Sequence, residues 1–228
     1  LLEILPGSLI WATFVLAVVF SFTWPIAVIV FIIIFDLLWL FRVVYFVIYL
    51  LHAWRQYRFE TSVDWFGELQ KLPDWRRIHH LIFLPTYKEG YEIMRSAVAC
   101  IDASSYPNDR MLLVLAGEER DRVAFERDAK RLEKEFGSHF LKFLITVHPA
   151  NLQGEIPGKG SNLHFSATQV KPVIEALGIP AEDVIVSSFD VDTCAHAQYF
   201  ARLAQLYLTV PNPTRSSYQP VTTFSNNI

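Results

Sequence analysis

The fold class is decided by one stretch, Val184-Ile185-Val186-Ser187-Ser188-Phe189-Asp190-Val191-Asp192. A short run rich in β-branched residues ends in two carboxylates, a pattern typical of a buried parallel strand that opens into a site. Ligands of open α/β sheets bind just outside the carboxyl ends of the strands. On an extended strand Asp190 and Asp192 would point to the same face. They suit a divalent cation that carries phosphates, although a helix cap and an ordinary turn are the simpler alternative.

Strands and helices alternate along the chain ahead of this stretch. The expected elements are strands at 80–84, 111–116 and 140–147 and helices that end near Ala103, Gly137 and Leu177, with a further helix over 196–207. Strands that alternate with helices at this spacing form right-handed βαβ units. The sequence therefore predicts an α/β domain, Rossmann-like, with a mainly parallel sheet flanked by helices.

Composition excludes some classes of partner. The 228-residue chain is 52% hydrophobic and has a net charge of −3, which offers no basic surface for nucleic acid. The two cysteines, Cys100 and Cys194, are too few for a disulfide framework, so a reducing compartment is the simpler interpretation. We expect both to act as small buried apolar side chains.

The apolar excess lies near the N-terminus. Between residues 9 and 51 only Asp36 and Arg42 are charged. A helix needs roughly 20 apolar residues to cross a bilayer, so this run is long enough for two crossings. The simpler interpretation of the two charges is that Arg42 reaches toward the interface and Asp36 packs against another helix, rather than a function inside the membrane.

The break between the two crossings is expected at Pro25. It predicts helices at about 8–23 and 26–51, within a transmembrane hairpin over residues 1–53. Arg55 and Arg58 follow the second helix among aromatic residues. By the positive-inside rule, this arrangement predicts a multi-pass protein of the plasma (inner) membrane whose following domain is cytoplasmic.

Residues 54–78 are expected to form an amphipathic linker. Aromatic and aliphatic residues recur there near helical spacing, with charges between them. Such a helix would lie at the membrane surface or pack under the domain that follows. The domain itself is assigned to residues 79–228.

Polar residues follow the expected strand ends and would gather along one edge of the sheet. Tyr87 is suited to stack on a base, and Glu89 or Glu118 to accept hydrogen bonds from a base or ribose. For each residue alone, a solvated loop position is the simpler interpretation. The candidates are Thr86, Tyr87 and Glu89 after the first strand, Glu118 after the second, and Asp190 and Asp192 after the fourth.

A glycine-rich loop at 154–162 opens a helix and carries Lys159. Backbone amides at a helix N-terminus together with this lysine would form an anion site. The spacing differs from a Walker A loop, because Gly160 stands where Ser or Thr is required. His196 follows Asp192 by one helical turn and would complete a metal site or, more simply, cap a helix.

The motifs in their order resemble the family 2 glycosyltransferases with a GT-A fold. They are Leu84-Pro85-Thr86-Tyr87-Lys88-Glu89, Glu118, Gly158-Lys159-Gly160-Ser161-Asn162 and Phe189-Asp190-Val191-Asp192, within about 78–228. The membrane helices ahead of the domain look most like the membrane-integrated, cellulose-synthase-like branch.

The resemblance implies a nucleotide-diphosphate sugar donor, a saccharide or lipid acceptor, and Mg²⁺ or Mn²⁺. Lys159 would lie near the diphosphate, Asp190 near the ribose or metal, and Asp192 would bind the metal directly. It further implies that the nucleoside lies against Thr86, Tyr87 and Glu89, with Glu118 against the base. A divalent ion on the diphosphate stabilises the charge of the leaving group.

Two departures from the family pattern stand out. Lys88 occupies a position where the family commonly has Asn, and Glu118 replaces the usual Asp. The general base and the Gln-x-x-Arg-Trp segment of this family would lie beyond Ile228, so we expect an N-terminal piece that binds donor and metal without transferring sugar. The alternatives are a metal-dependent nucleotidyl- or phosphotransferase and a non-catalytic, membrane-tethered nucleotide-binding module.

Overall fold

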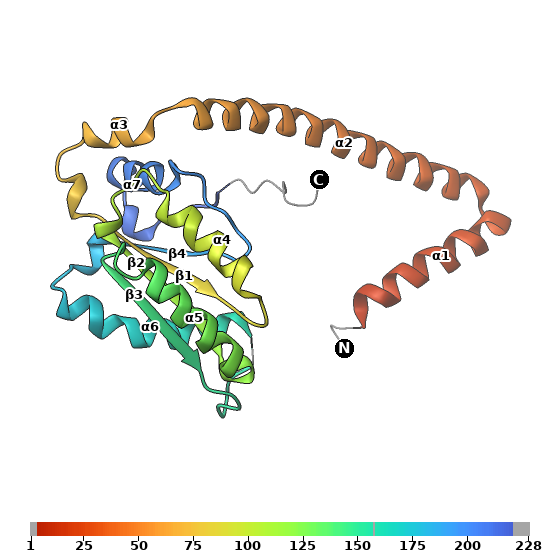
Figure 1. Cartoon of the computed structure of the whole chain (residues 1–228). Coiled ribbons are helices and arrows are strands. Elements are labelled where there is room, and N and C mark those ends of the chain that lie inside the picture. Colours follow the sequence, from red (N-terminus) through yellow and green to blue (C-terminus); the bar gives the residue numbers. More distant parts are fainter. Residues whose placement is uncertain (1–3, 157, 221–228) are drawn as a thin grey trace. The chain divides into compact units, whose positions relative to one another are not determined.

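The structure is a computed structural model that describes residues 4–156 and 158–220 (Figure 1). By their internal contacts the residues divide into two units, Leu1–Ser62 and Val63–Ile228. The first unit consists of helices, and the second contains the sheet.

Two helices make up the first unit, α1 (Leu5–Thr23) and α2 (Pro25–Ser62). Only Trp24 separates them. Pro25 has no N–H group and its ring clashes with the preceding turn, so the hydrogen-bond ladder of α1 cannot continue through it. The same residue suits the first position of the next helix. The predicted break at Pro25 is therefore confirmed.

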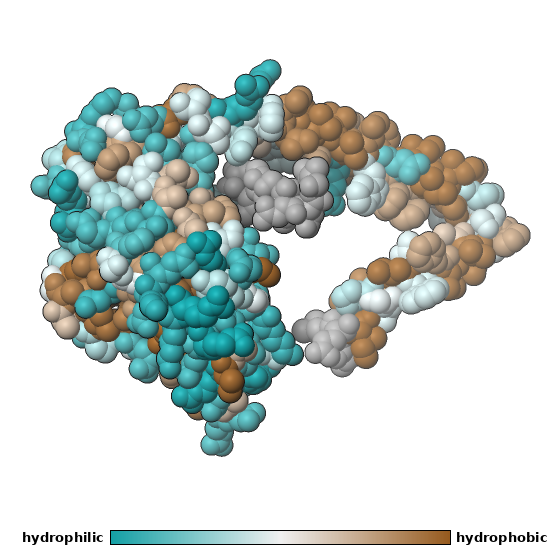
Figure 2. All heavy atoms as spheres, in the orientation of Figure 1, coloured by the Kyte–Doolittle hydropathy of each residue, from teal (hydrophilic) through white to brown (hydrophobic). Residues whose placement is uncertain are grey.

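Apart from Asp36 and Arg42, both helices are apolar around their whole circumference up to about residue 51. None of their described residues is buried, and Figure 2 shows hydrophobic residues along most of their length. With 19 and 38 residues, each is long enough and apolar enough to cross a membrane. α2 continues well past the end that we predicted at about residue 51, so it includes Arg55 and Arg58.

The segment 54–78, predicted as one amphipathic linker, is divided among three elements. Its first part is the end of α2, and α3 (Trp65–Gln70) and a 3-10 turn (Trp75–Arg77) follow. Trp65, Leu69 and Trp75 are buried in the core of the second unit. Burial of these large side chains explains why the part after Ser62 packs with the domain, the second of the two placements that the sequence left open.

The second unit contains one four-stranded sheet. Every pairing is parallel, as predicted, and the order is β3-β2-β1-β4. β1 and β2 are the central strands and are buried along nearly their whole length, which explains their continuous apolar sequences. The strands are β1 (His79–Pro85), β2 (Met111–Glu118), β3 (Lys142–His148) and β4 (Val184–Ser188).

Helices cover both faces of the sheet. The four longest of this unit are α4 (Tyr91–Asp102), α5 (Arg122–Phe136), α6 (Lys159–Ala176) and α7 (Tyr199–Thr209). α7 begins three residues later than predicted. The unit is thus an α/β domain of the predicted class.

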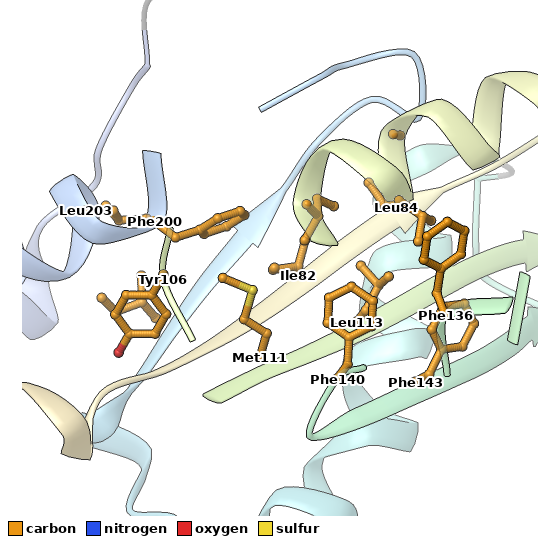
Figure 3. Close-up of a cluster of buried hydrophobic side chains, with 14 of the residues drawn as sticks. Ile82, Leu84, Tyr106, Met111, Leu113, Phe136, Phe140, Phe143, Phe200 and Leu203 are labelled. Carbon is orange, nitrogen blue, oxygen red and sulfur yellow. The ribbon is translucent and has the colours of Figure 1, made fainter. Parts of the chain in front are cut away.

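Alternate residues of the central strands contribute to two separate cores. One face buries Ile82, Leu84 and Leu113 against α4, α5 and α7 (Figure 3). The other face buries Leu81, Phe83, Leu112 and Val114 against Val170 of α6. The sheet is therefore the middle of three layers.

The strand order reverses between β1 and β4. The chain moves outward from β1 through β2 to β3, then crosses back with α6 and adds β4 on the other side of β1. Open α/β sheets bind their ligands at such a reversal, outside the carboxyl ends of the strands. A ligand-binding site is therefore expected at the loops after β1 and β4.

Candidate functional site

One carbonyl group holds three elements together at the carboxyl edge of the sheet. The carbonyl oxygen of Ala116, in β2, accepts a hydrogen bond from the backbone N–H of Thr86 at 2.9 Å. It also accepts one from the side-chain amide of Asn162, in the first turn of α6, at 2.8 Å. Asn162 is buried, and its bond fixes the N-terminus of α6 beside the loop that follows β1. We did not assign this role to Asn162 from the sequence.

The N-terminus of α6 also contacts the loop after β4. Lys159 Nζ lies 2.5 Å from Asp190 Oδ1, and the two side chains are 48% and 71% exposed. The backbone N–H of Phe189 donates to the carbonyl of Phe83 at 3.1 Å, which holds the start of this loop next to β1. Two of the predicted site residues, from separate motifs, are thus in direct contact.

A second contact brings Tyr87 and Glu118 together through Arg120. The guanidinium of Arg120 lies 4.5 Å from the centre of the Tyr87 ring. It also forms a hydrogen-bonded ion pair with the buried carboxylate of Glu118. The hydrogen bond to Glu118 holds the pKa of Arg120 above its usual value. We did not predict Arg120 as part of the site. Its position in the turn after β2, where ligand-binding residues are expected, could have indicated it from the sequence. Lys88 Nζ lies near the same ring, 5.0 Å from its centre.

The other candidates of the first loop are engaged with nearby backbone. Thr86 is buried, and its hydroxyl donates to the carbonyl of Leu84 at 3.2 Å. The carboxylate of Glu89 accepts a hydrogen bond from the backbone N–H of Tyr87. Both side chains stabilise the shape of the loop, and only Tyr87 presents an exposed ring.

Asp190 and Asp192 lie in a turn rather than on an extended strand. β4 ends at Ser188, and the backbone N–H of Thr193 donates to the carbonyl of Asp190 at 2.9 Å. Val191 between them is buried, while both aspartates are exposed. The strand alternation that we expected to align the two carboxylates is therefore wrong, because the strand stops too early.

The described residues contain no group of three or more histidine, cysteine, aspartate or glutamate side chains that could hold a metal ion. Mg²⁺ commonly uses only one or two carboxylates and takes its remaining ligands from phosphate and water, so an exposed Asp190 and Asp192 fit that manner of binding. His196 accepts a hydrogen bond from the backbone N–H of Gln198 at 3.2 Å, in the turn ahead of α7. It does not cap this helix, because Gln198 occupies the N-cap position.

Two cavities adjoin these loops. A small one of about 40 Å³ lies beside Glu118 and Arg120, and it includes His148, whose Nε2 is 2.9 Å from the carboxylate of Glu155. The other, of about 470 Å³, runs along the free edge of β4. Its lining includes Val186, Ser188, Tyr199, Tyr207 and Tyr218, and it contains neither Asp190 nor Asp192.

No protein-family model matches the chain, and no curated protein shows a significant match to it. The functional assignment therefore depends on the motifs in their order and on the contacts between them.

Proposed function

We propose that this chain is the donor-binding part of a membrane-bound glycosyltransferase. It binds a nucleotide-diphosphate sugar together with Mg²⁺ or Mn²⁺, and the sugar is used to build a polysaccharide or a glycolipid. The class is that of the family 2 enzymes with a GT-A fold.

The contact between Lys159 and Asp190 carries this proposal. It brings a cation at a helix N-terminus to an acid that follows a strand, at the reversal of strand order where α/β sheets bind ligands. A nucleoside diphosphate needs a cationic group and helix amides for its phosphates and carboxylates for the accompanying metal. All of these groups lie on adjoining loops.

The remaining residues suit the nucleoside. The Tyr87 ring is exposed and offers a flat apolar surface, and the pair of Arg120 and Glu118 beside it offers hydrogen-bond donors and acceptors. In the proposed complex the base lies against Tyr87, Glu118 accepts its hydrogen bonds, and Thr86 and Glu89 keep the loop in shape. Asp190 and Asp192 supply carboxylate oxygens to the metal ion, which stabilises charge on the departing diphosphate.

Binding of nucleoside diphosphates tests this function. The chain is placed in lipid nanodiscs, and the affinities of UDP, GDP and ADP are measured by calorimetry with Mg²⁺, with Mn²⁺ and with EDTA. We expect metal-dependent binding of at least one of them. Asp192→Asn should weaken that binding at least about tenfold, the size of one lost hydrogen bond to a charged group.

Asp109→Asn is the matched control. Asp109 is an exposed acid in the turn that precedes β2, at the opposite edge of the sheet, and its replacement should leave the affinity unchanged. Equal affinities of the wild type and Asp192→Asn, or no binding of any nucleoside diphosphate in the presence of metal, would contradict the proposal.

We further propose that α1 and α2 span the plasma (inner) membrane with the α/β domain on the cytoplasmic side. Arg55 and Arg58 in the C-terminal part of α2 support this orientation through the positive-inside rule. A membrane-impermeant maleimide tests it, because Cys194 is exposed. The reagent should label Cys194 in inside-out vesicles and not in right-side-out vesicles. Labelling of Cys194 in right-side-out vesicles alone would show that the domain lies on the opposite side of the membrane.

A further inference from the structure

The two cysteines of the chain lie together in the folded domain. Cys100 is in the last turn of α4 and is half-buried, whereas Cys194 is exposed in the loop between β4 and α7. The two thiols are neighbours, and the presence of Cys194 helps to raise the pKa of Cys100. Our expectation that both are buried apolar side chains is therefore wrong, since one of them is open to solvent.

Four hydrogen bonds hold the loop of Cys194 along α4 and its C-terminal end. The sulfur of Cys194 lies 3.5 Å from the hydroxyl of Ser96 and 3.8 Å from its carbonyl oxygen. Farther along, the carbonyl of Ala197 accepts hydrogen bonds from Ser105 N–H at 2.9 Å and from the Ser104 hydroxyl at 3.2 Å. Ser96 and Cys100 are one helical turn apart and share a face of α4. The loop is thus attached on both sides of Cys100, which keeps Cys194 next to it.

We propose that Cys100 and Cys194 form a redox-sensitive pair that closes to an intramolecular disulfide when the protein meets hydrogen peroxide. In the first step the Cys194 sulfur attacks the peroxide and the O–O bond breaks. The products are a sulfenic acid at Cys194 and, after uptake of the thiol proton, one water molecule.

In the second step the Cys100 sulfur attacks the sulfenic sulfur. The S–S bond forms, the S–O bond breaks, and the departing hydroxide takes the Cys100 proton to give a second water. In total the two thiols lose two electrons and two protons, and one peroxide molecule is reduced to two water molecules.

Exposure decides the order of these steps. Peroxide reaches the exposed Cys194 directly, whereas Cys100 is shielded by the helix and the loop. Burial, followed by the neighbouring thiol of Cys194, raises the pKa of Cys100 to about 11. Cys100 therefore stays a thiol at neutral pH and acts as the resolving partner.

The disulfide would tie the loop that follows Asp190 and Asp192 to α4. Disulfides of this kind in a reducing compartment are transient and serve redox sensing, because glutathione and thioredoxin reverse them. The pair does not depend on which ligand the aspartates bind, so it stands or falls separately from the proposed function.

Peptide mapping tests the pair. The complete chain in nanodiscs is exposed to hydrogen peroxide, denatured, alkylated with iodoacetamide and digested with trypsin without reduction. We expect loss of both free thiols and a cross-linked species of the peptides 96–110 and 160–202, which dithiothreitol removes. Retention of both free thiols, or a cross-link between two chains only, would overturn the proposal.

Two single variants separate the roles of the thiols. In Cys100→Ser, peroxide should leave a sulfenic acid at Cys194 that dimedone traps. In Cys194→Ser, Cys100 should remain available for alkylation after the same treatment. If Cys100 of that variant were oxidised as fast as in the wild type, the assigned order would be incorrect and the paired mechanism would fail.

Discussion

Lys159 Nζ and Asp190 Oδ1 lie 2.5 Å apart, and this contact joins the N-terminus of α6 to the loop that follows β4. The pair is largely exposed, so its contribution to folding is only about 0–1 kcal/mol. Its position at the reversal of strand order, rather than its strength, makes it relevant to function.

Lys159→Gln should therefore separate binding from stability. We expect the affinity for a nucleoside diphosphate to fall at least about tenfold, because the charged donor for the phosphates is lost. The free energy of unfolding should change by less than about 1 kcal/mol. Calorimetry and urea unfolding measure the two quantities. Lys171→Gln, in the same helix and paired with Glu175, is the matched control and should alter neither. A stability loss as large as the binding loss would indicate a structural role for Lys159.

Arg120→Ala should destabilise the domain, because it leaves the buried carboxylate of Glu118 without its ion pair. Thermal unfolding should show a lower midpoint for this variant than for Arg122→Ala, whose ion pair with Glu126 is more exposed. In the double variant Arg120→Ala/Glu118→Gln part of the lost stability should return, since the buried charge is then removed as well. Equal midpoints for Arg120→Ala and Arg122→Ala would contradict this account of the turn.

His80 should make the stability of the domain depend on pH. It is fully buried between the rings of Tyr106 and Phe200, and burial lowers its pKa from 6.5 to about 3. Below pH 6.5 the unfolded chain binds a proton that the folded domain does not, so stability falls as the pH is lowered toward 3. The slope from this single group is at most about 1.4 kcal/mol per pH unit.

Urea unfolding at several pH values, compared between the wild type and His80→Phe, isolates this contribution. The variant should lose less stability between pH 7 and pH 4, because phenylalanine fits among the same rings and cannot be protonated. The pKa of His79 is also lowered by burial, so some pH dependence should persist in the variant. His164→Gln replaces an exposed histidine and should leave the profile of the wild type unchanged. Parallel profiles for the wild type and His80→Phe would refute the assignment.

Lys88 should be replaceable by asparagine without loss of stability. Its φ of 69° lies in the left-handed region, which costs a residue with a Cβ about 1–2 kcal/mol and which asparagine adopts more readily. We expect Lys88→Asn to be neutral or more stable by up to about 1 kcal/mol, and Lys88→Val to be less stable. Lys88→Ala is the control, because it removes the cation beside Tyr87 and has neither the preference of asparagine for the left-handed region nor the strong aversion of valine to it. A loss of stability in Lys88→Asn larger than in Lys88→Ala would show that the backbone conformation is not what matters.

The sequence alone determined the kinds of element and their order along the chain. The apolar run ahead of residue 52 and the position of Pro25 predicted two long helices with a break between them, because hydrophobicity and the missing N–H of proline act locally. Short β-branched runs alternating with amphipathic ones predicted a parallel α/β sheet for the same reason. The end of β4 was less predictable, since Phe189 and Val191 are apolar although the strand stops at Ser188.

The tertiary structure decided which loops are neighbours. Lys159 and Asp190 are 31 residues apart in sequence, and Ser96 and Cys194 are 98 apart. Neither contact follows from local preference, because each depends on the side of β1 to which the chain returns after β3. That return creates the reversal of strand order, gathers the candidate site at one edge of the sheet, and lays the loop after β4 along α4. Burial and pairing across such distances are properties of the packed chain, so the role of Asn162 and the cysteine pair became visible only in the fold.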